Sequence, residues 1–153
     1  MPAGTYRGID LVEVEYRLSL MTGGGDGVSR GDGNDMDVAE QGTPDMTVTV
    51  NTGRGFINNA FIRQIAIETS STVTAPTGGA PGDLRRKDLV QFTFGSGINI
   101  KAGSESATPS PPSTDADSIV LAHLYMRSGA VSIKDSDDAS NGYIVIDANK
   151  DWA

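Results

Sequence analysis

Apolar and polar residues alternate with a period of two along several segments of this chain. The clearest case is residues 9–20, where one face of an extended chain is apolar and the other is mostly charged. The apolar face carries Val12, Val14, Tyr16, Leu18 and Leu20, and the polar face carries Glu13, Glu15, Arg17 and Ser19. This pattern predicts a β-strand with one buried face.

Further strands are predicted where alternating or apolar runs lie between turn-forming residues. They cover residues 46–50, 55–58, 61–68, 88–94, 98–101, 119–127, 130–135 and 143–148, with a short strand or turn near 36–38. Residues 119–127 are the most apolar, and the Gly and Pro residues around them favour a central strand over a short helix. We therefore predict an all-β chain that folds as an antiparallel β-sandwich or a small barrel.

Long loops rich in glycine or proline separate these strands. Residues 23–45 and 74–83 are rich in glycine, and residues 102–118 contain prolines that fix φ and remove backbone donors. The chain of 153 residues fits one domain. Because the strand at 9–20 stands apart from the others, we divide the chain into an N-terminal strand arm, residues 1–22, and a single β domain, residues 23–153.

Composition and charge exclude several classes of function. The net charge is −8, so we expect no binding to the phosphate backbone of nucleic acids. No apolar run approaches the roughly 20 residues that span a bilayer, and the first ten residues lack the apolar core of a secretory signal, so we expect no membrane partner. The only cluster of basic residues, Arg85 to Lys87, is predicted to be a solvated turn before a strand.

Residues suited to catalysis are scarce. His123 is the only histidine, and there is no cysteine, so neither a paired nucleophile and base nor a zinc site can be assembled from these residues. On a regular strand His123 shares a face with Ile119, Leu121 and Tyr125, which predicts a core or subunit-contact role. We expect no enzymatic activity, no catalytic residue and no cofactor.

Two acidic segments, residues 32–37 and 134–142, have oxygen donors that calcium prefers. Neither segment has the glycine and glutamate spacing of an EF-hand, and Asp and Asn are also common in turns. We therefore predict no metal site. Asp135, Asp137 and Asp138 are the alternative, as a calcium site.

Several segments, taken in order, resemble bacteriophage tail-fibre and baseplate proteins. DMTVTVNTGRGFINNAFI, residues 45–62, resembles their Met-x-Val-x-Val strand, glycine-containing turn and second strand. DLRRKDLVQFTF, residues 83–94, resembles their Arg-x-Asp-Leu-Val segment before a core strand. ATPSPPSTDADSIVLAHLYMRSGAVSIKDSDD, residues 107–138, resembles their proline-rich loop, apolar strand and Asp-rich ending. The likeness runs from Asp26 to Asp138 and is that of an N-terminal docking domain of fibre proteins.

This resemblance implies a non-enzymatic structural protein of a tailed-phage virion. It implies a tail-fibre, baseplate or neck adaptor that docks as an oligomer, most simply a homotrimer, with other virion proteins as partners. Two alternatives remain open. One is a capsid decoration or head-fibre protein, which uses a similar β scaffold, and the other is a carbohydrate-binding module.

Assembly is expected to use the most apolar segments of the domain and the N-terminal strand arm. The predicted interface residues are Val12, Val14, Tyr16, Leu18, Leu20, Phe56, Phe61, Ile65, His123 and Tyr125. A lone apolar stripe on residues 9–20 would favour aggregation, so it must be buried. We expect the arm to cross to a neighbouring subunit.

Overall fold

A computed structural model describes residues 26–29, 35–78 and 84–145. This part of the chain is all-β and has no helix, so it also has no helix that could cross a membrane. The strands are β1 (Gly27–Val28), β2 (Val38–Glu40), β3 (Val48–Val50), β4 (Gly53–Ile57), β5 (Ala60–Gln64), β6 (Glu68–Thr69), β7 (Arg85–Thr93), β8 (Gly97–Lys101), β9 (Ser118–Arg127), β10 (Ile133–Lys134) and β11 (Gly142–Val145). The predicted fold class is confirmed as a sandwich, and the strands do not close into a barrel.

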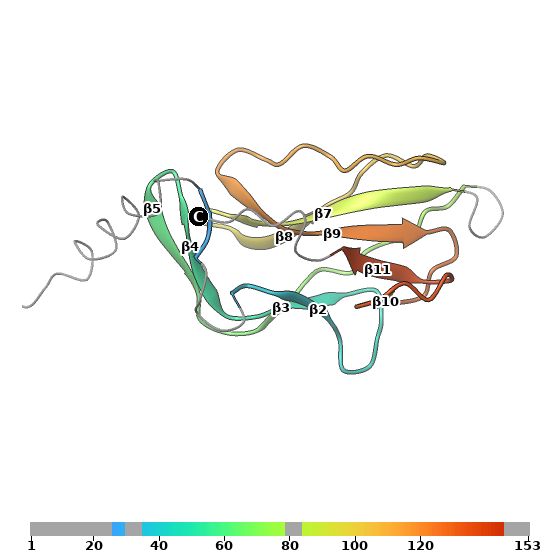
Figure 1. Cartoon of the computed structure of the whole chain (residues 1–153), viewed down its shortest axis with the longest axis horizontal. Helices are drawn as coiled ribbons and strands as arrows, with labels where there is room; N and C mark the ends of the chain where they lie inside the picture. Colours follow the sequence, from blue (N-terminus) through green and yellow to red (C-terminus); the bar gives the residue numbers. More distant parts are fainter. Residues whose placement is uncertain (1–25, 30–34, 79–83, 146–153) are drawn as a thin grey trace, which may run out of the picture.

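The largest sheet has five strands in the order β10-β11-β9-β7-β8. All of its pairs are antiparallel except β10 with β11, which are parallel. The two longest strands, β7 and β9, lie next to each other in the middle of this sheet (Figure 1). The inner face of β9 is buried and its outer face is partly buried, which accounts for the apolar character of residues 119–127.

Two smaller sheets complete the domain. The sheet β2-β3-β6 lies below the five-stranded sheet in Figure 1, and its Val48 and Val50 belong to the same buried core as Leu124 and Met126 of β9. The sheet β1-β4-β5 lies at one end of the molecule, on the left in Figure 1. It adds Val28, Ile57 and Ile62 to this core.

The turn predicted at NTGRG, residues 51–55, is not a turn. β3 and β4 belong to different sheets, and the hairpin joins β4 to β5 through Asn58 and Asn59, whose φ angles are 52° and 63°. Asparagine tolerates this left-handed conformation better than most residues. Gly53 and Gly55 instead allow close packing, because a Cβ atom would overlap the backbone of Met36 at the first and of Gly27 at the second.

A β-bulge in β9 changes which residues share a face. Val90 pairs with Ala122, but Gln91 pairs with Val120, so Leu121 is an extra residue in β9. The expectation that His123 shares a face with Ile119 and Leu121 is therefore wrong. Ile119 and Leu121 are in the buried core, whereas His123 and Tyr125 lie on the outer face of the sheet and are half-buried.

Arg86 is also placed differently from its prediction. Because side chains two residues apart share one face of a strand, Arg86 and Asp88 point to the same interior side of β7 as Val90. Arg86 is only 9% exposed, and its Nε and Nη2 donate to the two Asp88 oxygens at 2.6 and 2.8 Å. Arg85 is exposed and Lys87 is half-buried, so the solvated interpretation fails at Arg86.

Candidate assembly surface

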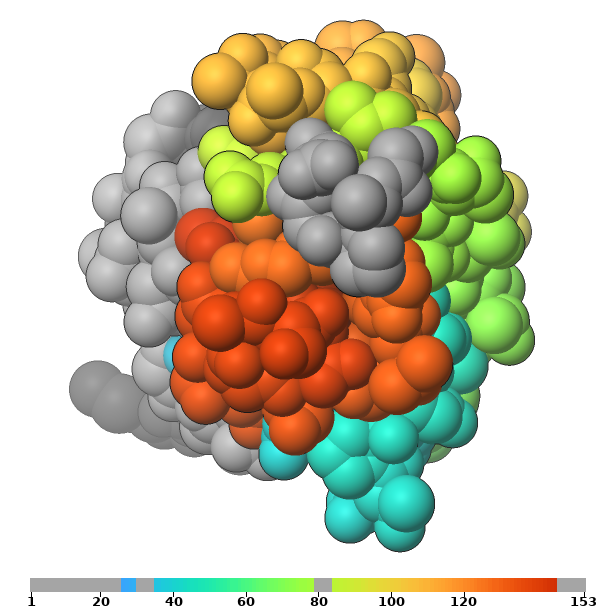
Figure 2. Space-filling model, turned by 90° about the vertical axis from the view of Figure 1, so that its right-hand side faces the viewer, coloured from blue at the N-terminus to red at the C-terminus, as the bar shows by residue number. Residues whose placement is uncertain are grey.

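One side of the sandwich is closed by hydrogen bonds between its two main sheets. The backbone N of Glu40, in β2, donates to Asp135 Oδ1 at 2.7 Å, and the backbone N of Asp135 donates to Glu40 Oε2 at 3.0 Å. The backbone N of Ile133 also donates to the Asp45 carbonyl at 2.7 Å. In Figure 2 the corresponding orange-red and teal residues lie against each other. Three backbone N–H groups on this side therefore have partners that join the two sheets.

The opposite side is open. β8 and β6 are the last strands of their sheets, and within the described ranges neither has a second neighbouring strand. Ile98 and Ile100 of β8 are half-buried and pack against the core from the edge. An edge strand with unpaired backbone groups is a natural place for another strand to bind.

A cavity of about 330 Å³ opens between these two edges. Its lining comes from the segment after β6 and from the β7–β8 part of the large sheet: Ser71, Thr72, Val73, Thr74, Arg86, Asp88, Ile100 and Ala102. Arg86 and Asp88, the charged residues in this cavity, bind each other. Arg86 also donates to the Thr74 carbonyl at 2.5 Å, and Asp88 accepts from the Gly103 backbone N at 2.9 Å. The cavity is thus a recess beside Ile100 in which the charges are mutually neutralised.

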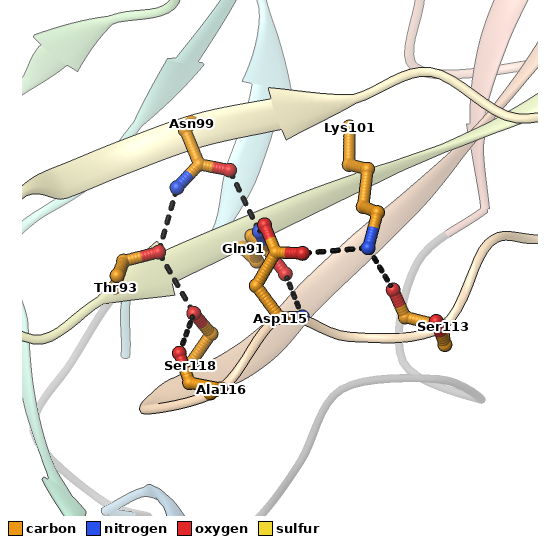
Figure 3. Close-up of polar contacts among 8 residues, drawn as sticks. All are labelled: Gln91, Thr93, Asn99, Lys101, Ser113, Asp115, Ala116 and Ser118. Atoms are coloured by element: carbon orange, nitrogen blue, oxygen red, sulfur yellow. Dashed lines mark hydrogen bonds and ion pairs between the residues drawn. The ribbon is translucent and has the colours of Figure 1, made fainter.

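The outer face of β7 and β8 is covered by the proline-rich segment, residues 102–117. Gln91, which is fully buried, donates to Asp115 Oδ2 at 2.6 Å and accepts from the Asp115 backbone N at 3.1 Å (Figure 3). Lys101 Nζ donates to Asp115 Oδ1 and to the Ser113 carbonyl. The hydrogen bond from Lys101 is the main cause that lowers the pKa of Asp115. This segment therefore seals the face above β8 but does not pair with its edge.

The outer face of β9 and β11 carries an aromatic cluster. Tyr125 and Tyr143 are cross-strand neighbours with ring centroids 5.2 Å apart, and the Arg127 guanidinium lies 5.2 and 5.3 Å from their centroids. Arg127 is held by Asp137 and by the Asn141 carbonyl, each at 2.8 Å. His123 lies on the same face, two residues before Tyr125. The structure thus brings two predicted interface residues together and adds Tyr143 and Arg127.

The other predicted interface residues are scattered. Phe56 is buried, in edge-to-face contact with Phe61, which is half-buried, so Phe56 is not on the accessible surface. Ile65 is 75% exposed in the connection between β5 and β6, where the predicted strand 61–68 is interrupted. Val12, Val14, Tyr16, Leu18 and Leu20 lie outside the described residues.

The sequence prediction missed several exposed apolar side chains, and two of them, Phe94 and Ile67, lie near the open side. Phe94, in the turn before β8, is 52% exposed, and Ile67, just before β6, is 64% exposed. Val131, between β9 and β10, is 75% exposed. The sequence does not show that β8 is an edge strand, because the alternation of Ile98 and Ile100 is equally typical of a strand inside a sheet.

The Asp135–Asp138 segment is bound by hydrogen bond donors. Asp135 accepts from Glu40 N, Asp137 from Arg127 and Ala139 N, and Asp138 from Lys134, Ser140 N and Asn141. Within the described ranges, no three His, Cys, Asp or Glu residues are grouped as metal ligands. The three carboxylates are therefore not brought together as a calcium site.

These bonds also change the acidity of two of the carboxyls. The bond from Arg127 is the main cause that lowers the pKa of Asp137. The side chain and backbone N of Asn141, with Lys134 and Ser140, lower the pKa of Asp138 well below its usual range. Both carboxyls therefore remain ionised to a lower pH than a free aspartate.

Comparisons with known proteins give no match: no protein-family model, no curated protein and no solved structure is significantly similar to this chain. The functional argument therefore rests on the residues and the geometry of the chain itself. Its two strongest elements are the open side next to β8 and the aromatic cluster on β9 and β11.

Proposed function

We propose that this chain is a non-enzymatic structural protein of a tailed-phage virion, a tail-fibre, baseplate or neck adaptor that docks as an oligomer. The observation that carries the proposal is the asymmetry of the sandwich. One side is closed by the Glu40–Asp135 hydrogen bonds, and the other presents the β8 edge with Ile98 and Ile100. A scaffold with one open apolar edge is suited to joining other subunits.

A non-enzymatic role is supported by the state of the charged groups. The buried pair Arg86–Asp88 lies at the cavity, but its donors and acceptors are directed at each other and at nearby backbone groups. A catalytic acid or base needs a free position toward its substrate. The residues that line this cavity are therefore better explained as structural.

Oligomer formation is supported by the exposed apolar side chains near the open side. Phe94 and Ile67 add to the half-buried Ile98 and Ile100. We propose a homotrimer, because closed symmetry is the default for homo-oligomers and three-fold symmetry is what the fibre resemblance implies. Native mass measurement of the full chain at micromolar concentration should give three copies, and a monomer alone would contradict this proposal.

The direct test is to purify particles of the phage whose genome encodes this chain and to quantify the protein by mass spectrometry. The proposal expects a fixed copy number, in a multiple of three or six, at one end of the particle. Hundreds of copies spread over the head would instead support the capsid decoration or head-fibre alternative. Absence from the particles would refute a virion role.

A second candidate, a carbohydrate-binding module, is favoured by the aromatic cluster. Tyr125 and Tyr143 form adjacent half-buried rings on the outer face of a sheet, and Arg127 supplies a fixed cation beside them. Glycan-array binding by the isolated chain that is lost in Tyr143→Ala would support this function. An array without signal for the wild-type protein would remove it.

A further inference from the structure

The free edge of β8 lacks the usual features that prevent strand pairing. Natural edge strands are commonly protected by proline, by charged side chains or by bulges. Residues Gly97–Lys101 contain no proline, and their one charge, Lys101, is bound to Asp115 at 2.6 Å on the outer face. Within the described part of the chain, no backbone group from another segment pairs with this edge. The backbone N–H and C=O groups along this edge can therefore pair with an added strand.

The two faces of β8 specify what such a strand must look like. On the inner side, Ile98 and Ile100 pack against the core, and Ile100 also lines the cavity of about 330 Å³. On the outer side, Asn99 and Lys101 take part in the polar network with Gln91 and Asp115. An added strand must therefore carry apolar side chains on one face and polar side chains on the other.

Residues 9–20 of the N-terminal strand arm have this alternation. Val12, Val14 and Tyr16 would fall on the face with the isoleucines, and Glu13 and Glu15 on the face with Lys101. Among the residues that the structure does not describe, this segment has the clearest alternation in the sequence. Its apolar stripe needs a buried site, and the recess beside Ile100 offers room for an apolar side chain.

The described chain begins at the end of the molecule where β8 also begins. The Asp26 carboxylate accepts from the Asn58 backbone N at 2.7 Å, and the Asn58 side chain bonds Asp117. The Asp117 carbonyl in turn accepts from the backbone N of Phe94, in the turn before β8, at 2.8 Å. In Figure 1 this is the left end, near the β4–β5 hairpin. Asp26, the first residue that the structure describes, is therefore close to the beginning of β8.

Two observations favour a second copy as the donor. The predicted strand of twelve residues spans about 40 Å, whereas the five residues of β8 offer only about 17 Å, so the rest of its apolar stripe needs a further surface beside the domain whose β8 holds it. Phe94 is also 52% exposed beside the start of β8, and a single added strand would not cover it. A neighbouring domain packed against the β8 edge would cover both the rest of the apolar stripe and Phe94.

We propose that the β8 edge receives residues 9–20 of a second copy of this chain as an additional strand. This inference rests on the proposed assembly role and specifies both its partner and its site. Each domain donates one arm and accepts one, which gives a closed oligomer when the exchange runs around a symmetry axis.

Because the chain has no cysteine, the exchange can be tested with single-cysteine variants of the full chain. Ser19→Cys and Glu13→Cys label the arm. Ser96→Cys labels the beginning of β8 and Ser104→Cys the segment beyond its end, so one of these receptor positions lies near the arm in either strand orientation. Arm and receptor variants carry tags of different size, are mixed, unfolded, refolded together and treated with a short thiol-specific crosslinker.

The proposal expects a crosslinked heterodimer with Ser96→Cys or Ser104→Cys that is absent with the control Ser136→Cys, which lies in the exposed Asp135–Asp138 segment on the closed side. A double variant, Ser19→Cys with Ser96→Cys, that crosslinks only within one chain would overturn it, because the arm would then bind its own domain. Equal crosslinking at Ser136 or none at any receptor position would also overturn it.

These results are separable from the test of the proposed function. A specific heterodimer crosslink together with absence from purified particles would leave the arm exchange standing and remove the virion role. Presence in particles without the crosslink would retain the virion role and remove the arm exchange.

Discussion

At the scale of single residues, the glycines of β4 show that one residue type serves different purposes in neighbouring positions. Gly53 and Gly55 lie in a strand and are required by backbone contacts with Met36 and Gly27, whereas the turn is made by Asn58 and Asn59. From sequence alone, NTGRG is more simply interpreted as a turn, because glycine is the usual turn residue. Only the packing of β1 on β4 reveals the actual constraint.

This constraint predicts a large difference between two glycine-to-alanine variants. In Gly55→Ala the new Cβ meets the Gly27 carbonyl, which should lower the free energy of unfolding by about 2 kcal/mol, the usual effect of overpacking. Gly42→Ala is the control, because nothing lies within 4 Å of a Cβ there. Chemical denaturation measures both variants, and similar stabilities for the two would contradict the close packing of β1 and β4.

The buried pair Arg86–Asp88 is the second residue-scale case. Its position could have been suspected, because Arg86 and Asp88 are in phase with Val90 and Phe92 along β7. The cluster of basic residues around Arg86 instead favoured a solvated turn. The sequence alone does not show that the segment with Thr74 covers Arg86 and that the Thr74 carbonyl accepts a hydrogen bond from it.

Removal of one partner should therefore be costly. Asp88→Asn leaves the Arg86 guanidinium buried without its counter-charge, and we expect a loss of about 3 kcal/mol in the free energy of unfolding. The double variant Arg86→Met with Asp88→Leu should recover most of this loss, because it leaves no unpaired charge. Urea denaturation of the three proteins tests the pair, and a wild-type-like Asp88→Asn variant would show that the pair is not important for stability.

At the scale of elements, the strands of the large sheet were more predictable than the sheet to which each short strand belongs. β7, β8 and β9 are close to their predicted ranges, since apolar runs between turn residues are a strong signal. The predicted strand 61–68 is divided into β5 and β6, which belong to different sheets, and the interruption leaves Ile65 exposed. Which sheet a short strand joins depends on contacts distant in sequence, which alternation does not encode.

The bulge in β9 shows how one extra residue can change which side chains share a face. Leu121 shifts the alternation, so that His123 and Tyr125 face outward beside Tyr143 rather than sharing a face with Ile119. A period of two cannot reveal such a shift within a run that is apolar on both sides. The sequence therefore predicted Tyr125 as an interface residue but did not predict its partner in the aromatic cluster, Tyr143.

The segment between β10 and β11 provides a pH-dependent prediction. The bonds to Asp138 lower its pKa in the folded state below the value of 3.8 for an unperturbed aspartate. A lowered pKa means that its stabilising effect is complete above about pH 4 and is lost as the pH falls toward the folded-state pKa. Asp138→Asn should therefore be less stable than the wild type at pH 7, and the two stabilities should converge in acid.

Thermal or urea unfolding of both proteins at several pH values checks this dependence. Asp26→Asn is the control, because its carboxylate also accepts from a backbone N–H but is bound to the β4–β5 hairpin, which lies at the other end of the domain from β10 in Figure 1. A stability difference between Asp138→Asn and the wild type that is independent of pH would contradict the assigned role of the Asp138 carboxylate.

At the scale of the whole molecule, the described part of the sandwich is closed on one side and open on the other, and this difference connects the fold to the proposed function. The closed side is joined through Glu40 and Asp135, while the open side presents β8 and the adjoining cavity. The sequence predicted an arm that needs a site but not the site itself. The receiving edge became recognisable only from the strand order of the large sheet.

The central claim is that this domain is joined to its neighbours in a virion through the N-terminal strand arm, and deletion of residues 1–20 tests it most directly. The full chain and the truncated chain are each produced in trans during infection by a phage that lacks the gene, and both are quantified in purified particles. We predict that the truncated protein unfolds cooperatively in isolation but is absent from particles, while the full chain is present at a fixed copy number. A truncated protein that no longer folds would place residues 9–20 in its own core, and equal incorporation of both chains would contradict docking through the arm.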